Sequence, residues 1–425
     1  MFIPGAAPGD EARVRIVKDC KRYAFGILDE VLTPSPDRIP VDCAVAGPCG
    51  GCSLRHLDYA AELRAKQENV ADAFARIGGL DVPVLPIVGS PEVNRYRNKV
   101  QFPVGVDKSG KPCIGFYAGR THRIVPCPDC RLQPGVLNEI GNALCAFFAE
   151  KGIQPYSEET GRGLVRHIFL RRGAHSGQIM VCLVCTRAKL PSAEELCTRL
   201  KAQFAEITTI LLNVNAKNTN VILGTETHTL YGQGYIEDTL CGVPVQLGPL
   251  SFYQVNTLAA EQLYGIAAQY AQLTPDDLLL DLYCGMGTIG LSMAAHCREL
   301  IGVEIVPEAI ESAKANAARM GTDVAAKSRF FCADAGQAAT RLAAEGLHPD
   351  IVMLDPPRKG CDEATLSAVV RMSPRRVVYV SCNPATAARD AAWLEQNGYH
   401  AEKVQPVDLF PRTRHCECVL SLSKV

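Results

Sequence analysis

A cysteine at the end of a predicted strand is the residue of this sequence best placed for covalent chemistry. The apolar run 377–380 predicts a buried strand, and residues 385–394 predict a helix directly after Ser-Cys-Asn-Pro at 381–384. A strand that passes into a helix places the Cys382 thiol at the carboxyl edge of a sheet, where open α/β sheets bind ligands. The start of the helix would favour the thiolate, which is the nucleophilic form of cysteine.

Two carboxylates set Cys382 apart from the other cysteines, for which a buried structural role is the ordinary interpretation. Asp355 follows the predicted strand 350–354, and Glu417 precedes the apolar pair Val419-Leu420. A thiolate that adds to C6 of uracil makes C5 able to attack a sulfonium methyl group, after which a base must remove the C5 proton. Cys382 is the candidate nucleophile and Glu417 the candidate base, while Asp355 could hold the pyrimidine edge or the methyl donor. Taken alone, Glu417 would be interpreted as a plain strand carboxylate.

The pattern that predicts the methyl-donor site is a strand, a glycine turn, a helix and a second strand that ends in an acid. Residues 277–282 predict the first strand, the turn at 283–290 contains Gly285 and Thr288, and the strand 301–304 ends at Glu304. The glycines admit a ligand close to the backbone, and the acid accepts hydrogen bonds from ribose hydroxyls. Because the turn is Gly-Met-Gly-Thr rather than a full GxGxxG, S-adenosylmethionine is favoured over a dinucleotide. Asp334, after a third strand at 330–333, is placed to meet an adenine amine.

A second group of cysteines has the spacing of metal ligands. Cys49 and Cys52 form a CxxC around two glycines, and Cys43 precedes them by six residues. Thiolates on such a turn converge on one ion or cluster, and a fourth ligand must come from Cys127 or Cys130. The spacing leaves zinc and an iron–sulfur cluster both open.

Composition favours a cytosolic globular protein of two or three domains. The 425 residues include 47% hydrophobic and 21% charged side chains, with a net charge of −1. No signal peptide and no membrane-length apolar run is evident, so the 19 cysteines indicate metal-binding or catalytic thiols in a reducing compartment. Between residues 95 and 131, Lys and Arg outnumber acids and form a local basic region that could follow a phosphate backbone or be ordinary solvated surface: 95, 97, 99, 108, 111, 120, 123 and 131.

The remaining pattern predicts three regions of different architecture. Residues 11–17 and 23–31 predict two strands, which are too few for an independent domain. Residues 41–250 predict an α+β region, and strands that alternate with helices after residue 250 predict a doubly wound parallel sheet. In the middle region we expect helices at 57–77, 132–151 and 193–205, and strands at 100–104, 114–117, 167–172, 179–184, 207–214 and 221–223.

Together these motifs resemble those of the RNA uracil-5-methyltransferases, most closely the iron–sulfur enzymes that act on 23S ribosomal RNA. The resemblance runs from about residue 10 to the end of the chain. It rests on five stretches: 43–52 with its three cysteines, Ser-Phe-Tyr-Gln-Val-Asn at 251–256, Asp-Leu-Tyr-Cys-Gly at 281–285, Leu-Asp-Pro-Pro-Arg-Lys-Gly at 354–360, and Ser-Cys-Asn-Pro at 381–384.

The resemblance implies roles for individual residues. It implies a [4Fe–4S] cluster on Cys43, Cys49, Cys52 and Cys130, which leaves Cys127 as a spare thiol. It implies Cys382 as nucleophile and Glu417 as base. It also implies S-adenosylmethionine contacts from Gln254, Tyr283, Glu304, Asp334 and Asp355, in addition to the turn residues Gly285 and Thr288.

The resemblance also implies a division of the chain and a substrate. Residues 1–40 would be the last portion of the family's RNA-binding β-barrel (a TRAM-like segment), 41–250 the iron–sulfur and RNA-binding region, and 251–425 the methyltransferase domain, with helix 57–77 packed on the latter. We expect a cytoplasmic enzyme that acts on 23S ribosomal RNA, without a membrane or an obligate protein partner. A transfer-RNA T-loop enzyme is the second hypothesis, and an RNA-binding cluster protein with a spent catalytic domain is the third.

Overall fold

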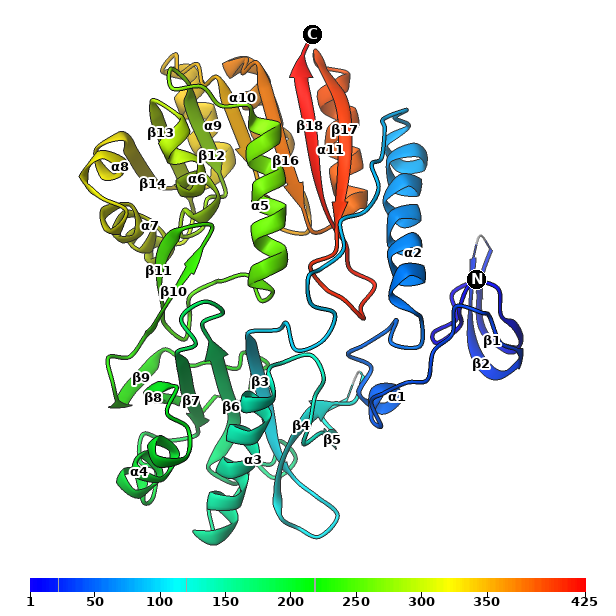
Figure 1. The fold of residues 1–425 in the computed structure, drawn as a ribbon, viewed down its shortest axis with the longest axis vertical. Helices are drawn as coiled ribbons and strands as arrows, with labels where there is room; N and C mark the ends of the chain where they lie inside the picture. Colours follow the sequence, from blue (N-terminus) through cyan, green and yellow to red (C-terminus); the bar gives the residue numbers. More distant parts are fainter. Residues whose placement is uncertain (22, 120, 218) are drawn as a thin grey trace.

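The computed structural model describes residues 1–425 except 22, 120 and 218, so Arg120 of the basic region lies outside the described residues. Two seven-stranded sheets dominate the molecule. Figure 1 shows the sheet of the C-terminal half above the sheet of the central region, with an N-terminal hairpin to one side.

The upper sheet is the predicted doubly wound sheet, with strand order β14-β13-β12-β15-β16-β18-β17. Its first five members are parallel, and β18 runs antiparallel to both of its neighbours. The parallel strands are short apolar runs because helices cover both of their faces. The strands are β12 (Leu278–Leu282), β13 (Glu299–Glu304), β14 (Ser328–Cys332), β15 (Ile351–Leu354), β16 (Arg376–Ser381), β17 (Tyr399–Val407) and β18 (Glu417–Lys424).

Two hydrophobic cores lie on opposite faces of this sheet. One core includes Leu263 of α5, Leu291 of α6 and Ala313 of α7, and the other includes side chains of α2, α9, α10 and α11. None of the helices in the described part of the chain combines the length and the apolar character that a membrane crossing requires. The helices after residue 250 are α5 (Thr257–Ala271), α6 (Thr288–Met293), the 3₁₀ turn η2 (Ala294–His296), α7 (Pro307–Arg319), α8 (Thr322–Lys327), α9 (Ala335–Ala344), α10 (Glu363–Met372) and α11 (Pro384–Glu395).

The lower sheet has the order β5-β4-β3-β6-β7-β8-β9, and its pairs are antiparallel except β7 with β8. Helices α3 (Gly135–Glu150) and α4 (Ala193–Gln203) pack on it around Phe148 and Leu196. The strands are β3 (Lys99–Val106), β4 (Pro112–Tyr117), β5 (Ile124–Pro126), β6 (Val165–Arg172), β7 (Ile179–Cys185), β8 (Ile207–Val214) and β9 (Glu226–Tyr231). A separate hairpin of β10 (Ile236–Leu240) and β11 (Val243–Leu247), absent from the sequence prediction, follows the sheet.

The strand predicted at 221–223 is wrong, because β9 begins at Glu226. The Asn215 amide donates to the carbonyls of Val221 and Ile222 at 2.7 and 3.0 Å. These backbone groups therefore bond to a side chain instead of a neighbouring strand. Val221 is also 63% exposed, so its apolar character reflects a surface loop.

The N-terminal part of the chain contributes a helix to the upper unit and a following segment that bridges β17 at Val84 and Val88. Helix α2 (Tyr59–Asp72) continues into a π-helical turn (Ala73–Gly78) and places Val70 and Phe74 in the core beside α11. A short helix α1 (Ala46–Cys49) precedes it.

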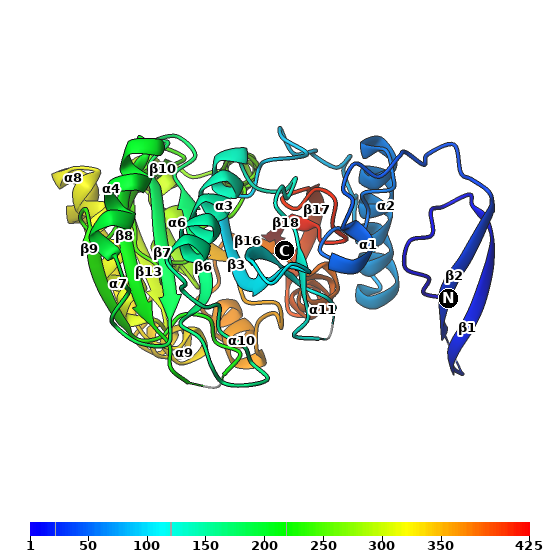
Figure 2. The same ribbon diagram turned by 90° about the horizontal axis from the view of Figure 1, so that it is seen from below.

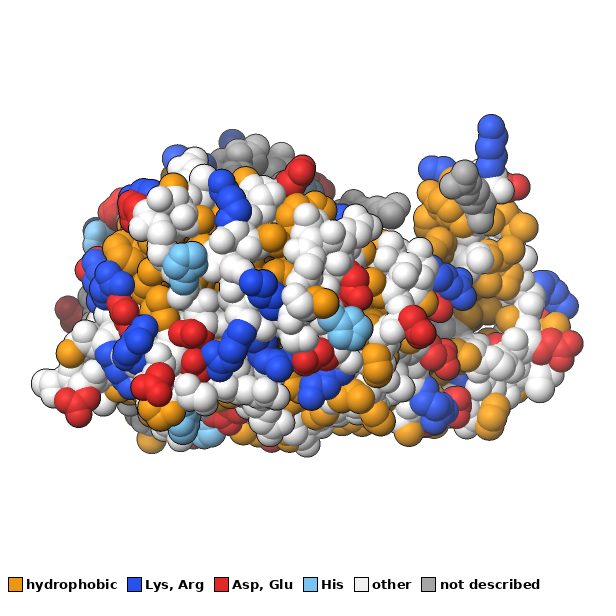
Figure 3. All heavy atoms as spheres, turned by 90° about the horizontal axis from the view of Figure 1, so that it is seen from above, with side chains coloured by type: hydrophobic (Ala, Val, Ile, Leu, Met, Phe, Trp, Pro, Cys, Tyr) orange, Lys and Arg blue, Asp and Glu red, His pale blue; other side chains and the backbone are white. Residues whose placement is uncertain are grey.

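The hairpin of β1 (Glu11–Cys20) and β2 (Tyr23–Thr33) stands apart from both sheets, beside α2 (Figures 1 and 2). Hydrophobic side chains gather on its surface (Figure 3). Phe2, Tyr23 and Phe25 of this hairpin region are 39–58% exposed, and their ring centroids lie 5.5–5.8 Å apart in edge-to-face and tilted contacts.

Candidate functional site

The pairing of β16 with β18 brings the candidate nucleophile and the candidate base to one edge of the sheet. Strand β16 ends at Ser381, directly before Cys382, and β18 begins at Glu417. Because the two strands are antiparallel and Ser381 pairs with Cys418, Cys382 and Glu417 lie next to each other at that edge. Asp355 follows β15, the parallel neighbour of β16, and reaches the same edge. These three residues, separated in sequence, are thus gathered as the sequence predicted.

An arginine that the sequence analysis did not single out completes this group. The Arg358 side chain lies beside Cys382 and acts to lower the pKa of its thiol. Its backbone is fixed by the turn before α11, because the Asn383 side-chain amide donates to the Arg358 carbonyl at 3.0 Å. Arg358 lies in the Asp-Pro-Pro-Arg stretch at 355–358, but its direction toward the thiol depends on contacts with a distant part of the chain.

Burial dominates the electrostatics of the three acids near this edge. It raises the pKa of Glu417 to about 8, and the neighbouring Asp355 carboxylate adds to the rise while Arg358 opposes it. Burial alone raises the pKa of Asp355 to about 7. The pKa of Asp281, at the end of β12, rises to about 8 through burial and then through Asp355 and Glu304. Each acid holds its proton more tightly in the folded chain than in the unfolded chain, so its contribution to stability falls as pH rises toward 8.

The thiol of Cys382 departs from the sequence prediction. The start of α11 led us to expect a favoured thiolate. In the structure, burial first and then the negative charges of Glu417 and Asp355 raise the pKa of Cys382, with Arg358 acting in the opposite direction. A helix N-terminus contributes only a modest charge effect, and here burial, together with two nearby carboxylates, raises the pKa of the thiol.

The glycine turn after β12 is held by the acid that the sequence predicted for ribose recognition. Glu304 accepts hydrogen bonds from the backbone N–H groups of Gly285, Ile305 and Val306, at 3.1, 2.9 and 3.0 Å. The acid therefore joins the end of β13 to the glycine turn. Tyr283, at the start of the turn, has a φ of 69°, a conformation that is strained for a residue other than glycine.

The other predicted donor-site residues fall into two groups. Gln254 and Thr288 both share hydrogen bonds with the Tyr264 hydroxyl on α5, so the loop before α5 and the start of α6 meet there. Tyr264 was not predicted, because a tyrosine on an apolar helix face is ordinarily part of the core. Asp334 instead caps α9, where its Oδ1 accepts from the Gln337 N–H at 3.1 Å.

An unpaired acceptor next to the glycine turn fits a cationic ligand. Asp281 is 1% exposed, and its Oδ2 accepts from the Gly290 N–H at 3.0 Å. Its Oδ1 is buried and has no hydrogen-bond partner among the described residues. S-adenosylmethionine carries a sulfonium and an ammonium group, and a site with Asp281, Asp355 and Glu417 has the opposite charge. The residues therefore fit the predicted donor.

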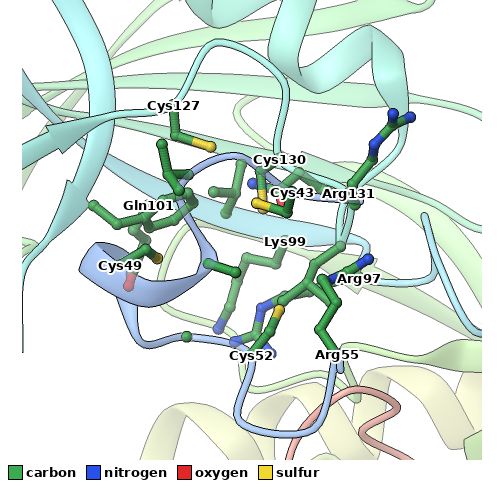
Figure 4. Close-up of a pocket in the computed structure, with 17 residues that line it drawn as sticks. Cys43, Cys49, Cys52, Arg55, Arg97, Lys99, Gln101, Cys127, Cys130 and Arg131 are labelled. Carbon is green, nitrogen blue, oxygen red and sulfur yellow. The ribbon is translucent and has the colours of Figure 1, made fainter. Parts of the chain in front are cut away.

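The second set of predicted ligands lines a cavity of about 210 Å³ between α1 and β3. Figure 4 shows Cys43, Cys49, Cys52 and Cys130 facing this cavity. Cys127, expected to be a spare thiol, faces it too and hydrogen-bonds to Cys130, which lowers the pKa of the Cys130 thiol.

The wall around these thiols is basic and lacks carboxylates among its lining residues. Arg55, Arg97, Lys99 and Arg131 all line it. Arg55 is 3% exposed, and its Nη1 donates to Asp42 Oδ1 at 2.7 Å and to Asn94 Oδ1 at 3.0 Å, yet its Nε and Nη2 have no partner in the described part of the chain. Burial and two neighbouring arginines lower the pKa of Lys99 to about 8. A buried cation needs negative charge nearby, and cluster-bound thiolates would add to the charge that Asp42 supplies to Arg55.

Five cysteines of the described chain line the cavity without converging on a single point. In the described residues, no three His, Cys, Asp or Glu side chains are arranged to hold one metal ion. Thiolates on one zinc stand about 3.8 Å apart, whereas the ligands of a four-iron cube are held further apart by the metal atoms between them. The residues present, thiols in a basic wall, are of the kind that would fit an iron–sulfur cluster.

The fold and the donor site together define the class of protein. An open sheet with five parallel strands and an antiparallel pair at one edge, a glycine turn and a strand-end acid are the architecture of an S-adenosylmethionine-dependent methyltransferase. A profile of the tRNA (uracil-5-)-methyltransferase family matches residues 174–425. The chain belongs to this family and is an S-adenosylmethionine-dependent RNA methyltransferase.

Relatives of this chain are similar along nearly its whole length. An uncharacterized RNA methyltransferase of Halalkalibacterium halodurans is 43% identical over 99% of this chain and 92% of its own. One from Clostridium tetani is 41% identical over 100% of this chain and 91% of its own. The crystal structure of a Pyrococcus abyssi tRNA (uracil-54, C5)-methyltransferase with S-adenosyl-L-homocysteine is 27% identical, with a TM-score of 0.78 over 99% of this chain and 95% of that one.

The three buried acids predict that donor binding depends on pH. Because the pKa values of Asp281, Asp355 and Glu417 are about 7 to 8, at pH 6 these groups are largely protonated. The sulfonium of S-adenosylmethionine favours their ionised forms. Its affinity should therefore rise about tenfold between pH 6 and pH 8.

Calorimetric titration at both pH values measures this effect. S-adenosylhomocysteine is the matched control, because it has the same adenosine and amino-acid groups but a neutral sulfur. Its affinity should change much less over the same interval. Equal pH dependence for the two ligands would contradict an electrostatic role for these acids.

Proposed function

We propose that this protein methylates C5 of a specific uridine in 23S ribosomal RNA through a covalent bond between Cys382 and C6 of the base. The observation that carries the reaction type is the convergence of a thiol, an arginine and two high-pKa carboxyls at one sheet edge. A nucleophile, a cation beside it and a base are the groups that methylation of an unactivated pyrimidine carbon requires.

Cys382 begins the reaction when its thiolate forms a bond to C6. The electrons of the C5–C6 double bond move to C5 and O4, so that C5 becomes nucleophilic. S-adenosylmethionine supplies a methyl group on a positively charged sulfur, which accepts the bonding electrons as C5 takes the methyl. Arg358, which lies beside Cys382, stabilises the thiolate before addition.

Glu417 completes the reaction by removing the proton from C5. The electrons of that C–H bond restore the C5–C6 double bond, and the bond from C6 to Cys382 breaks to regenerate the thiolate. A base with a pKa of about 8 is well matched to this step near neutral pH. The buried position of Glu417, 6% exposed, excludes water from the carboxyl group.

The choice of ribosomal RNA is supported by the cysteine-lined cavity. The donor set of Cys43, Cys49, Cys52 and Cys130 fits the iron–sulfur type of enzyme that the sequence resembles, whose members act on 23S RNA. We propose that these thiols hold a [4Fe–4S] cluster that joins α1 to the central sheet. The positive charges of Lys99 and Arg131 would stabilise the cluster thiolates and would also attract the RNA phosphates at this surface.

Transfer RNA is the second candidate substrate. It is favoured by the similarity to the Pyrococcus abyssi structure, whose name specifies tRNA uracil-54. The two substrates require the same chemistry, so the catalytic residues do not distinguish between them.

Two substitutions test the catalytic roles separately. Cys382→Ala removes the nucleophile, so turnover should be lost while S-adenosylmethionine still binds. Glu417→Gln leaves addition and methyl transfer possible but blocks proton removal, so a protein–RNA adduct should persist on a denaturing gel. Methylation by the alanine variant, or the absence of an adduct with the glutamine variant, would contradict these roles.

A map of 5-methyluridine identifies the substrate. Mass spectrometry of ribosomal and transfer RNA from cells with and without the gene should show loss at a 23S position. A plasmid copy that encodes Cys382→Ala is the control and should not restore the modification. Loss confined to transfer RNA would favour the second candidate instead.

Anaerobic purification tests the cluster. The protein should be brown and contain four irons and four sulfides per chain, as the proposed [4Fe–4S] stoichiometry requires. Cys130→Ser should lower the iron content, whereas Cys145→Ser, a buried cysteine outside the cavity, should leave it unchanged. A colourless protein with one zinc per chain would overturn the assignment.

A further inference from the structure

A buried ionic cluster lies outside the proposed reaction and has no assigned purpose. It consists of Lys66 and Glu62 on α2 and Asp408 after β17, and we call it the Lys66 cluster. The Lys66 Nζ lies 2.7 Å from Glu62 Oε1 and 2.8 Å from Asp408 Oδ1. The three side chains are 0–1% exposed, so the interaction is fully sheltered from solvent.

The ammonium group has a complete set of partners. Its third hydrogen bond goes to the Phe410 carbonyl at 3.2 Å. An ammonium group has three donors, and all of them are used here in fixed directions. Removal of one member would leave charge unpaired in the interior, which costs far more than loss of a surface ion pair. The Lys66 cluster therefore holds a defined geometry.

What the cluster holds is the connection between β17 and β18, residues 408–416. Glu62 Oε1 accepts from the Arg412 backbone N–H at 2.7 Å, and Asp408 Oδ1 accepts from the Phe410 N–H at 3.1 Å. Arg412 has a φ of 68°, an unfavourable conformation that persists because both its N–H and its side chain are bound.

Other parts of the molecule fix the same connection from its remaining sides. The Tyr96 hydroxyl donates to the Pro411 carbonyl, and the Asn256 amide donates to the Leu409 carbonyl, both at 3.0 Å. The Leu54 N–H donates to the Arg412 carbonyl, also at 3.0 Å. The connection is therefore hydrogen-bonded to the segment that follows Cys52, to the loop before β3 and to the loop that contains Gln254.

The connection leads directly into Glu417. Its backbone path from Asp408 sets where β18 begins, and β18 carries the Glu417 carboxyl to the sheet edge. A proton acceptor must lie within hydrogen-bonding reach of the proton that it removes. A shift of about 1 Å can cost on the order of a hundredfold in rate.

We propose that Lys66, Glu62 and Asp408 are positioning residues that hold Glu417 in place for removal of the C5 proton. This inference rests on the proposed covalent mechanism. It assigns to α2 a part in catalysis, although no residue of α2 is among the predicted catalytic or donor-binding residues. The role is specific to the last half of the reaction, because Cys382 and Arg358 are held by β16 and α11 instead.

The test measures the covalent adduct as well as turnover. Lys66→Met keeps the length of the side chain and removes its charge. We expect turnover to fall by about 10- to 100-fold and a Cys382-dependent protein–RNA adduct to accumulate, as with Glu417→Gln. S-adenosylmethionine affinity should stay within about twofold of that of the unaltered protein. Lys66→Arg should restore much of the turnover and reduce the adduct.

Arg166→Met is the matched control for simple loss of stability. Arg166 is a buried cation on β6 that pairs with Glu158 at 2.9 Å, away from the 408–416 connection. This variant should lower thermal stability without adduct accumulation. If Lys66→Met does not fold, Asp408→Asn provides the same test with a smaller change of shape.

The outcomes distinguish failure of the positioning role from failure of the proposed covalent mechanism. If Glu417→Gln accumulates the adduct but neither Lys66→Met nor Asp408→Asn does, the positioning role is overturned and the proposed function stands. The positioning role is overturned equally if Arg166→Met accumulates as much adduct as Lys66→Met. If no variant forms an adduct, Glu417→Gln included, the covalent mechanism fails and the inference fails with it.

Discussion

The concentration of negative charge at one edge of the upper sheet is the constraint on which the site depends. Asp281, Asp355 and Glu417 reach this edge from three different strands, and burial makes each carboxyl reluctant to ionise. A cationic methyl donor relieves this repulsion when it binds, and it is neutral at sulfur once the methyl has gone. The same acids that attract the substrate donor therefore lose part of their hold on the product.

The cysteine-lined cavity has the opposite electrostatic character. Its lining residues include four cations and no carboxylate. Arg55 pairs with Asp42, which lies outside the lining, at 2.7 Å, and still leaves two buried nitrogens without acceptors among the described residues. One region of the molecule therefore gathers buried acids, and another gathers cations, of which Arg55 is buried. Each imbalance is costly in the chain alone, and each is relieved by a ligand of the opposite charge. Buried polar or charged groups without partners in the protein are expected at sites that bind charged ligands.

Sequence patterns predicted the upper sheet well because its features are local. Continuous apolar runs define parallel strands, and the positions of Gly285, Glu304 and Cys382 follow from the ends of those runs. The features that were missed depend on contacts between distant segments. Arg358 is aimed by Asn383, the hydroxyl of Tyr264 joins two loops, and the raised pKa of Cys382 reflects carboxylates from other strands. The strand prediction at 221–223 was wrong for the same reason, because the Asn215 amide donates to the carbonyls of Val221 and Ile222.

The Lys66 cluster also constrains how the chain is made. Lys66 and Asp408 are separated by 342 positions, so α2 leaves the ribosome long before its ionic partner is synthesised. Until then, Lys66 can pair only with Glu62. Val70 and Phe74 also lack the later core residues against which they pack in the folded protein. Contacts of such long range form late and slow the folding of the domain that needs them. The methyltransferase unit can close around the proposed base, Glu417, only after the last strand has been translated.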